Sequence, residues 1–369
     1  MIQTRVVTVT AIVFSLLACA SSPRPARTAV RIPALTPAHL KNPRVIEAEL
    51  TVTLENIRPL TGDQLAADNA TLDLDPDKTP ELHVWSSQIV PRRAQSQIEF
   101  TEISPPPLGS VSDPVNGNEI LHWDLTPNLV PGGAVTLRRR FTYVCHEIDF
   151  DIDPDQILPY DTNSALYRFY TKSERLIETD DPRIRAIAAE ITAEAGNPYE
   201  RARRIFQWVC DSLDYHYPPG ERGACATLER GSGDCGEYSF LFIALCRASG
   251  IPARLVAGFK GLENTGHHAW AEFYLPGVGW VPADASMADR EDGDHDFDTH
   301  FAHLPNDRLV ASVGTNIPVR PTVQWANWSN SEIDQSVTDF MQLWTQAGSG
   351  FDASYAGSVS LRSAGTPAN

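Results

Sequence analysis

The chain has 369 residues, enough for two domains, and its hydrophobic share of 42% and its 28 prolines are typical of a globular, loop-rich protein. Its formal net charge of −17 argues against nucleic acid as a partner, because binding to phosphates needs clustered lysine and arginine side chains. An acidic surface otherwise favours solubility and indicates no particular ligand.

The first residues have the features of a secretion signal. Arg5 precedes an apolar stretch, residues 6–17, that is too short to span a bilayer, for which about 20 residues are needed. The stretch ends in Leu16-Leu17-Ala18-Cys19, which resembles the lipobox of bacterial lipoproteins. This resemblance implies a signal peptide over residues 1–18 and a lipid anchor at Cys19. The alternative is an ordinary secretion signal with a coincidental cysteine. Ala20, with no aspartate there, slightly favours the outer membrane by analogy with enteric bacteria.

Composition divides the rest of the chain. Residues 19–43 are rich in proline, alanine and arginine and are expected to form a tether. Residues 44–170 contain runs such as Val45 to Leu54 that alternate between apolar and polar side chains, separated by turn-forming residues. This pattern predicts an antiparallel β-sandwich within a protein of the α+β class. Residues 321–369 are expected to be an extension with a helix around residues 331–344 and a mobile tail after residue 347.

Residues 171–320 have the pattern of a domain that combines helices with an antiparallel sheet. Asp181-Pro182 and Asn197-Pro198 are helix-start signals. The second predicted helix carries an apolar stripe at helical spacing, formed by Ala202, Ile205, Phe206, Val209 and Leu213. A third helix, residues 235–249, is apolar on all sides and is therefore expected to be buried. Residues 254–259, 268–275 and 280–284 are expected to be strands.

Cys235 stands at the start of the third predicted helix, directly after Gly233-Asp234. Unpaired N–H groups and the helix dipole at such a position favour a thiolate over a thiol. The same N–H groups could bind the oxyanion that forms when a thiolate attacks an acyl carbon. Most cysteines in apolar helices are structural, and we interpret Cys246 in this way.

The number of cysteines is a weaker signal. If Cys19 carries a lipid, five remain: Cys145, Cys210, Cys225, Cys235 and Cys246. An odd number in an oxidising compartment leaves one thiol free. Cys210 and Cys225 bracket a loop and could form a disulfide, although their spacing does not determine the geometry.

A cysteine nucleophile needs a base and a third group that orients the base. His268 and Asp284, on neighbouring predicted strands, offer both. They share a face of the hairpin only if the connecting loop has an odd number of residues. A three-residue loop, residues 276–278, makes them diagonal neighbours. A four-residue loop, residues 276–279, places them on opposite faces unless a bulge intervenes.

Four blocks in this order resemble the core of the transglutaminase-like superfamily: GDCGEY, LCRASGIPAR, HAWAE and GWVPAD. The resemblance covers roughly residues 202–314 and implies a papain-like scaffold with a Cys-His-Asp triad. The triad falls on Cys235, His268 and Asp284, with His267 as a less favoured base. The sequence departs from the family where Ala285 follows Asp284, since the family often has Asp-Pro there.

The resemblance implies acyl transfer through a thioester, without a cofactor or a metal. The thiolate attacks an amide carbonyl, and an amine or water then takes the acyl group. Residues 289–303, dense in acids and histidines, are expected to be a solvated loop, with a cation site as the alternative. The expected protein is a membrane-tethered thiol enzyme that acts on proteins or peptides outside the cytoplasm. The alternative is a non-catalytic envelope scaffold that binds a partner through the β-sandwich.

Overall fold

The computed structural model describes residues 39–72, 74–289, 293–321 and 337–367, so the predicted signal peptide, Cys19 and most of the tether lie outside the described residues. Within these ranges the protein is a mixed α+β structure whose larger sheets are antiparallel, as predicted. None of the helices in the described ranges is long and apolar enough to cross a membrane.

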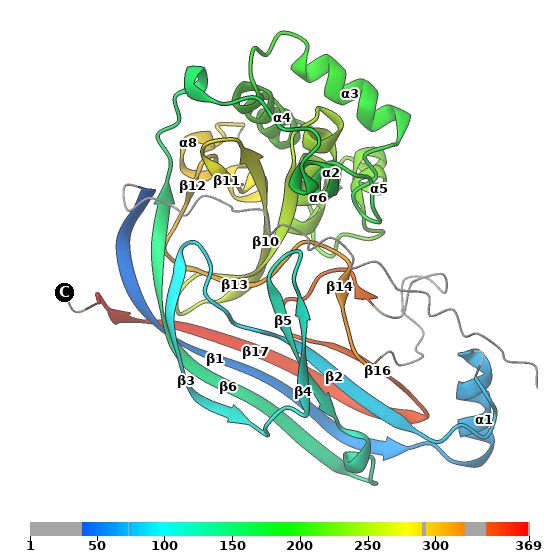
Figure 1. Cartoon of the computed structure of the whole chain (residues 1–369). Coiled ribbons are helices and arrows are strands. Elements are labelled where there is room, and N and C mark those ends of the chain that lie inside the picture. Colours follow the sequence, from blue (N-terminus) through cyan, green and yellow to red (C-terminus); the bar gives the residue numbers. More distant parts are fainter. Residues whose placement is uncertain (1–38, 73, 290–292, 322–336, 368–369) are drawn as a thin grey trace, which may run out of the picture. The chain divides into compact units, whose positions relative to one another are not determined.

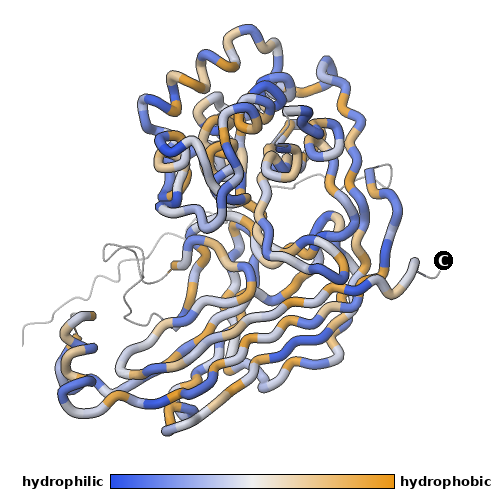
Figure 2. The backbone as a smooth tube through the Cα atoms, turned by 180° about the vertical axis from the view of Figure 1, so that it is seen from behind, coloured by the Kyte–Doolittle hydropathy of each residue, from blue (hydrophilic) through white to orange (hydrophobic). Residues whose placement is uncertain are grey.

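The first sheet contains the longest strands of the protein. Its order is β12 (His303–Leu304), β6 (Gly133–Asp149), β1 (Leu40–Pro59) and β17 (Phe351–Gly365), and β3 (Gln95–Ser104) also pairs with β6. Every second side chain of β1 from Ile46 to Leu54 is buried, because successive side chains of a strand point to opposite faces. Figure 2 shows this alternation as a change between hydrophobic and hydrophilic colours along the long strands.

A second sheet faces the first and completes the predicted β-sandwich. Its order is β16 (Thr345–Ser349), β2 (Glu81–Gln88), β5 (Asn118–Asp124) and β4 (Gly109–Asp113). Val84 of β2 and Trp123 of β5 lie in one apolar core with Leu50 of β1 and Phe141 of β6. A short helix, α1 (Gly62–Thr71), follows β1.

The predicted mobile tail is wrong, because residues 351–365 form β17. This strand pairs with β1 over almost its whole length, from Phe351 opposite Pro59 to Gly365 opposite Val45. The predicted helix around residues 331–344 is also wrong where it can be checked. Its first part lies outside the described residues, and residues 337–338 form a strand, β15, that pairs with β14 (Ile317–Pro318). Both sheets of the sandwich therefore contain strands from the last part of the chain.

In the sequence, a third sheet and most of the helices lie between the N-terminal and the C-terminal strands of the sandwich. The sheet order is β11 (Gly279–Ala283), β10 (Gly266–Leu275), β9 (Ala253–Lys260) and β13 (Arg308–Val313). The helices before this sheet are α2 (Ala165–Tyr170), α3 (Pro182–Thr192), α4 (Pro198–Ser212), α5 (Ala224–Arg230) and α6 (Cys235–Ala248), and two short helices after β11 are α7 (Ala285–Ala288) and α8 (Phe297–His300). Figure 1 shows α2 to α6 gathered on the side of β10 that lies away from the long strands.

Helix α6 is the centre of this arrangement. Residues 236–247 are all buried, as the apolar sequence of the helix predicts. The helices α3, α4 and α5 and the strands β9 and β10 contact it. A short parallel pair, β7 (Asp214–Tyr215) with β8 (Ser232–Gly233), leads the chain into the helix. Helix α5 is a finding of the structure, since the sequence analysis predicts no helix between the second and third predicted helices.

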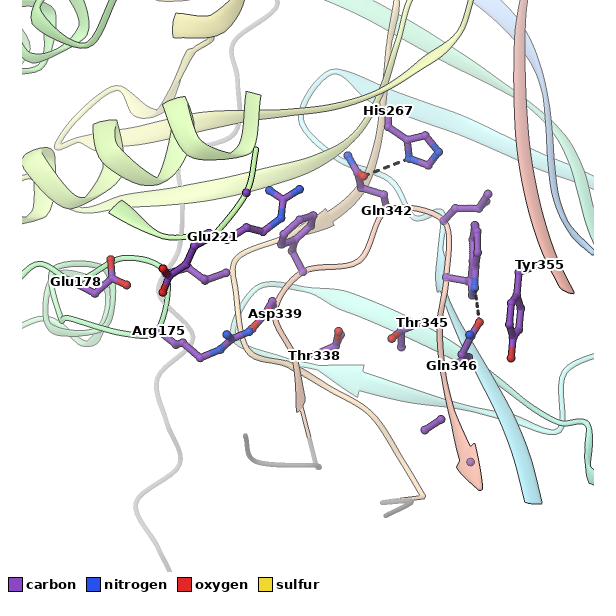
Figure 3. Close-up of a pocket in the computed structure, with 18 of the residues that line it drawn as sticks. Arg175, Glu178, Glu221, His267, Thr338, Asp339, Gln342, Thr345, Gln346 and Tyr355 are labelled. Atoms are coloured by element: carbon purple, nitrogen blue, oxygen red, sulfur yellow. Dashed lines mark hydrogen bonds and ion pairs between the residues drawn. The ribbon is translucent and has the colours of Figure 1, made fainter. Parts of the chain in front are cut away.

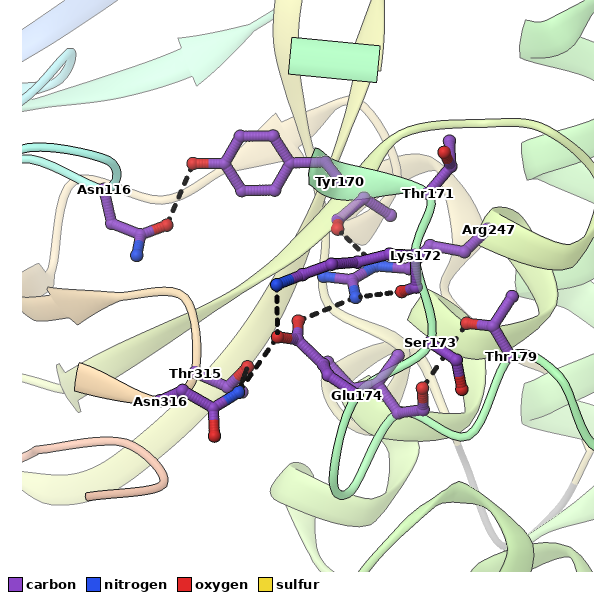
Figure 4. Close-up of polar contacts among 12 residues, drawn as sticks. Asn116, Tyr170, Thr171, Lys172, Ser173, Glu174, Thr179, Arg247, Thr315 and Asn316 are labelled. Atoms are coloured by element: carbon purple, nitrogen blue, oxygen red, sulfur yellow. Dashed lines mark hydrogen bonds and ion pairs between the residues drawn. The ribbon is translucent and has the colours of Figure 1, made fainter. Parts of the chain in front are cut away.

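A buried ion pair holds the C-terminal end of α6. Arg247 donates to Glu174 at 2.7 Å and to the carbonyl oxygen of Lys172 at 2.8 Å, and Asn316 donates to the other oxygen of Glu174 at 3.0 Å (Figure 4). The side chain of Arg247 is 2% exposed and that of Glu174 is 9% exposed, whereas that of Lys172, 3.8 Å from Glu174, is 45% exposed. The pair therefore connects α6 to the segment after α2 and to the chain after β13.

Candidate active site

Cys235 is the first residue of α6, as predicted. The carboxylate of Asp234 caps the helix by accepting a hydrogen bond from the Gly236 N–H at 2.7 Å. Gly233 is required for close approach, since a Cβ on it would lie 2.4 Å from the Cβ of Glu237. The backbone N–H of Ala269 in β10 lies close enough to the thiol of Cys235 to favour its ionised form. The cysteine therefore lies against the residue that follows His268.

The structure brings His268 and Asp284 together. The loop between β10 and β11 has three residues, 276–278, and Ala271 lies opposite Ala283, so that Asp284 and His268 are diagonal neighbours on one face. His268 Nε2 and Asp284 Oδ2 are 2.8 Å apart, and the two side chains are 2% and 1% exposed. Of the two loop lengths that the sequence allowed, the loop of three residues is therefore the one that forms. His267 instead lies 3.2 Å from Gln342, measured from Nδ1 to Oε1, so it is His268 that contacts the aspartate.

Arg308 is a charged neighbour of this pair to which the sequence analysis assigned no role. Its Nη2 lies 3.3 Å from Asp284 Oδ2, its Nη1 pairs with Asp307, and its side chain is 3% exposed. The backbone oxygen of Arg308 accepts a hydrogen bond from Tyr143 of β6 at 3.0 Å. Arg308 therefore links the carboxylate of Asp284 to the β-sandwich. Its place, 24 residues after Asp284 on another strand, leaves no local signal in the sequence.

The surroundings keep Asp284 ionised. Burial alone raises the pKa of a carboxyl group, but here the charge and hydrogen bond of His268, together with the charges of Arg308 and His300, outweigh it. The result is a pKa of about 2. An ionised carboxylate on Nε2 leaves Nδ1 as the imidazole nitrogen that can exchange a proton with a thiol.

A second buried acid lies under the start of α6. Glu237 is fully buried, and Arg222 lies 3.0 Å from its Oε1 and 3.3 Å from Asp234 Oδ2. Burial, followed by the hydrogen bond with Asp234, raises the pKa of Glu237 to about 8, against the opposing charge of Arg222. The raised pKa favours the protonated form of Glu237, which can donate to the carboxylate that caps α6.

This raised pKa predicts how a Glu237→Gln variant differs from the wild type. A carboxyl group whose pKa is raised on folding contributes its full stability below its unfolded pKa, about 4.3, and loses it as the pH rises through its folded pKa. Between about pH 4.3 and about pH 8, the wild type is therefore expected to lose stability relative to Glu237→Gln, which cannot ionise.

Urea unfolding of both proteins at a series of pH values measures this difference. Glu190→Gln, which removes an exposed carboxyl group from α3, is the control. A difference between the wild type and Glu237→Gln that does not change with pH would contradict the assignment of the proton to Glu237.

Comparison with known proteins places these residues in a family. Residues 185–285, which include Cys235, His268 and Asp284, match the transglutaminase-like superfamily. These residues form a transglutaminase-like domain.

Relatives and solved structures are similar to the chain in different regions. A protein-glutamine gamma-glutamyltransferase from Pseudomonas aeruginosa is 31% identical over 120 residues, which cover 28% of this chain and 18% of that protein. A protein of uncharacterised function from Haemophilus influenzae is 29% identical over 145 residues, which cover 32% of this chain and 39% of that protein. The chain thus spans less than half the length of these relatives.

The likeness of fold extends beyond the transglutaminase-like domain. The crystal structure of a candidate cysteine protease from Cytophaga hutchinsonii has a TM-score of 0.55 and 16% identity, covering 89% of this chain and 93% of that chain. At this identity the likeness concerns the fold, and it includes most of the β-sandwich as well as the transglutaminase-like domain.

The thiol of the transglutaminase-like domain differs from the sequence-based expectation in its acidity. Burial raises the pKa of Cys235 to about 12, and the nearby charge of Asp234 acts in the same direction, whereas the N–H of Ala269 acts against both. The start of a helix therefore does not by itself produce a thiolate here. Deprotonation needs an acceptor beside the thiol, and His268 is the candidate acceptor.

This environment predicts how alkylation of Cys235 depends on His268. In the wild type, His268 can take the proton as iodoacetamide reacts. In His268→Ala no imidazole takes the proton, so the raised pKa of the thiol limits the rate of labelling. We expect this rate to be about 100-fold lower at pH 7 and to keep rising as the pH approaches about 12. Mass spectrometry of the peptide that contains Cys235 measures both rates. Equal rates in the two proteins at pH 7 would show that His268 does not act on the thiol.

A large cavity lies beside these residues. Its volume is about 1110 Å³, and its lining contains Arg222, His267 and Gln342 but none of Cys235, His268 and Asp284. Gln342 bridges the two regions, because its Nε2 donates to the backbone oxygen of His268 at 2.8 Å while its Oε1 faces His267 (Figure 3). The far wall contains Thr345 to Gly348 of β16, which is an edge strand of its sheet.

The other cysteines and the acidic segment contribute no further chemistry to the described part of the site. Cys210 and Cys225 are both free thiols, so the disulfide that their spacing allowed does not form. Cys210 faces the backbone oxygen of Ala285, and Cys225 faces Asp181. Among the described residues, including those of the segment 289–303, no group of three or more histidine, cysteine and acidic side chains could hold a metal ion.

Proposed function

We propose that the protein is a thiol acyl-transfer enzyme that acts on amide bonds, with Cys235 as nucleophile, His268 as base and Asp284 as the group that orients His268. The observation that carries this proposal is the buried contact of 2.8 Å between His268 Nε2 and Asp284 Oδ2, one residue along β10 from the backbone N–H that faces the Cys235 thiol. These contacts support the Cys-His-Asp arrangement that covalent catalysis by cysteine needs.

The chemistry follows from these contacts. As the sulfur of Cys235 bonds to the carbonyl carbon of an amide, its proton passes to Nδ1 of His268. His268 then gives that proton to the leaving nitrogen, the C–N bond breaks, and a thioester remains. Water or an amine attacks the thioester while His268 takes its proton, the C–S bond then breaks, and His268 returns the proton to the sulfur of Cys235. The backbone N–H of Cys235 is the proposed donor to the oxyanion in both steps.

The cavity supports a protein or peptide as the substrate. Its volume of about 1110 Å³ exceeds that of most pockets for small ligands, which measure about 300–1,000 Å³. An extended peptide could pair along the cavity wall with the edge of β16 to which no described strand pairs. The sequence of residues 1–19 supports a lipid anchor at Cys19 and a location outside the cytoplasm, and the net charge of −17 argues against nucleic acid.

A peptide library incubated with the full-length protein and hydroxylamine tests the proposal. Mass spectrometry distinguishes the two acceptors, because an amine acceptor leaves hydroxamates whereas water leaves shortened or deamidated peptides. We expect one of these products from the wild type and from Cys225→Ala, which removes another free thiol, and none from Cys235→Ala.

The alternative function is a non-catalytic scaffold that binds a partner through the β-sandwich. It would be favoured if the folded wild type gave no product with any peptide and Cys235 reacted no faster with an acyl electrophile than Cys225 does.

A further inference from the structure

A small second cavity lies between the β-sandwich and the sheet of the transglutaminase-like domain. Its volume is about 50 Å³. Its walls come from β9, β10 and β13 on one side and from β6 and the start of β3 on the other. Trp270 and Glu272 line it from the face of β10 that also carries His268.

Positive charge is concentrated around this cavity, although the whole chain has a net charge of −17. Its lining contains one carboxylate, Glu272, and four arginines, which are Arg92, Arg93, Arg254 and Arg308. Glu272 is already bound, because its Oε2 accepts hydrogen bonds from Nε and Nη2 of Arg254 at 2.8 and 2.6 Å. Arg308 is paired with the carboxylates of Asp284 and Asp307.

Arg93 is the lining arginine whose guanidinium lacks partners. Its Nε, Nη1 and Nη2 atoms are buried, and in the described ranges none of the three has a hydrogen-bond partner. The charge of Glu272 acts on Arg93 without a hydrogen bond between them, and the guanidinium carbon lies 5.4 Å from the ring centroid of Phe150. Burying a guanidinium without hydrogen-bond partners is energetically unfavourable. Burial also lowers the pKa of Arg93, to about 10.

Further polar atoms in the lining lack partners in the same way. Within the described part of the chain, Trp270 Nε1, Arg308 Nε and His146 Nδ1 are buried without a hydrogen bond. Trp270 is 1% exposed and Arg308 is 3% exposed. Indole and guanidinium nitrogens can only donate, so the cavity offers many donors and few acceptors. Water, which must also donate, suits such a lining less well than an anion does.

The size of the cavity restricts the ligand. About 10–15 Å³ of such volume accommodates one water, so about 50 Å³ accommodates a group of only a few heavy atoms. A guanidinium binds carboxylates and phosphates through two parallel hydrogen bonds. We propose that this cavity is a binding site for a small oxyanion of the carboxylate or phosphate class, held by Arg93 with Trp270, His146 and Arg308 as further donors.

Two side chains that line the cavity, Trp270 and Arg308, also contact the candidate active site. Trp270 stacks on His268 with their ring centroids 6.0 Å apart, and Arg308 contacts Asp284. The oxyanion would therefore supply the partner that Arg93 lacks, next to the arginine that contacts Asp284.

Thermal unfolding of the full-length protein tests this site. Sodium phosphate, sodium acetate and sodium chloride are compared at equal ionic strength. We expect phosphate or acetate at about ten times its Kd to raise Tm by about 2–4 °C and to saturate, with a smaller effect of chloride. Phosphate alone would indicate a phosphate-class ligand, and acetate alone a carboxylate-class ligand.

Two variants decide whether the effect belongs to this cavity. Arg93→Gln is expected to lose the anion-dependent shift without a lower Tm in chloride, because it removes an unpaired buried charge. Arg183→Gln, which removes an exposed arginine, is expected to keep the shift. An equal shift in Arg93→Gln and wild type would overturn the proposal. If Arg93→Gln does not fold, calorimetric titration of the wild type with phosphate and acetate decides, and no saturable heat with either anion would overturn it.

Discussion

An Asp284→Asn variant is expected to lose about 10⁴-fold in kcat on any peptide that the wild type converts, with little change in KM. The amide cannot offset the positive charge that His268 gains when it takes the proton of Cys235. It can also present its NH₂ group to His268 and so favour the wrong tautomer. The expected loss is large because Asp284 is 1% exposed, and no water can replace its carboxylate at 2.8 Å from His268.

Asp307→Asn is the matched control for this variant. Asp307 also pairs with Arg308, but its side chain is 31% exposed and it makes no contact with His268 among the described residues. We expect Asp307→Asn to keep kcat within about tenfold of the wild type, in the range of a screened ion pair. Steady-state rates with the library peptide, and circular dichroism to show folding, measure both. Equal losses in the two variants would mean that Asp284 acts through Arg308 and not through His268.

The largest expected effect on stability comes from Arg247→Leu. The substitution leaves Glu174 buried with its charge uncompensated, and breaking a buried ion pair in this way costs about 3–5 kcal/mol of unfolding free energy. The carbonyl oxygen of Lys172 also loses its donor. Because Arg247 lies at the end of α6 opposite Cys235, the loss is expected in stability and not in the reactivity of the thiol.

Lys172→Leu is the control for this prediction. Lys172 also pairs with Glu174, but at 3.8 Å and with 45% of its side chain exposed, so it is expected to cost less than about 1 kcal/mol. Urea unfolding followed by fluorescence measures both variants. Adding Glu174→Gln to Arg247→Leu is expected to recover part of the loss, because it removes the stranded charge. No recovery would assign the loss to packing.

The parts of the fold that were predicted correctly are those whose pattern is local. Alternation from Ile46 to Leu54 indicates β1, and the apolar stripe from Ala202 to Val209 indicates α4. For the approach of His268 to Asp284, the sequence left two loop lengths open, and the three-residue loop of the structure is the one that places both side chains on one face. The assignment of a catalytic role to these residues and to Cys235 stays a prediction.

The parts that were missed depend on partners far along the chain. Of the 15 residues of β17, Leu361 is the one that is buried, so the strand has no apolar alternation of its own and forms because β1 pairs with it. The role of Arg308 was missed for the same reason, because its contact with Asp284 forms only after β13 has paired with β9. The environment of the Cys235 thiol was also missed, because the helix start is visible in the sequence, whereas the burial that raises the pKa of the thiol is not.

The pairing of β1 with β17 has a consequence for biosynthesis. Strand β1 is complete at Pro59, but the strand that covers its second edge begins only at Phe351. At about 5–20 residues per second, roughly 15–60 s of translation separate the two strands. During that time the nascent chain exposes a long strand edge of the kind that recruits other chains. A holding chaperone, or export before folding, would keep that edge from aggregating until the final strand is made.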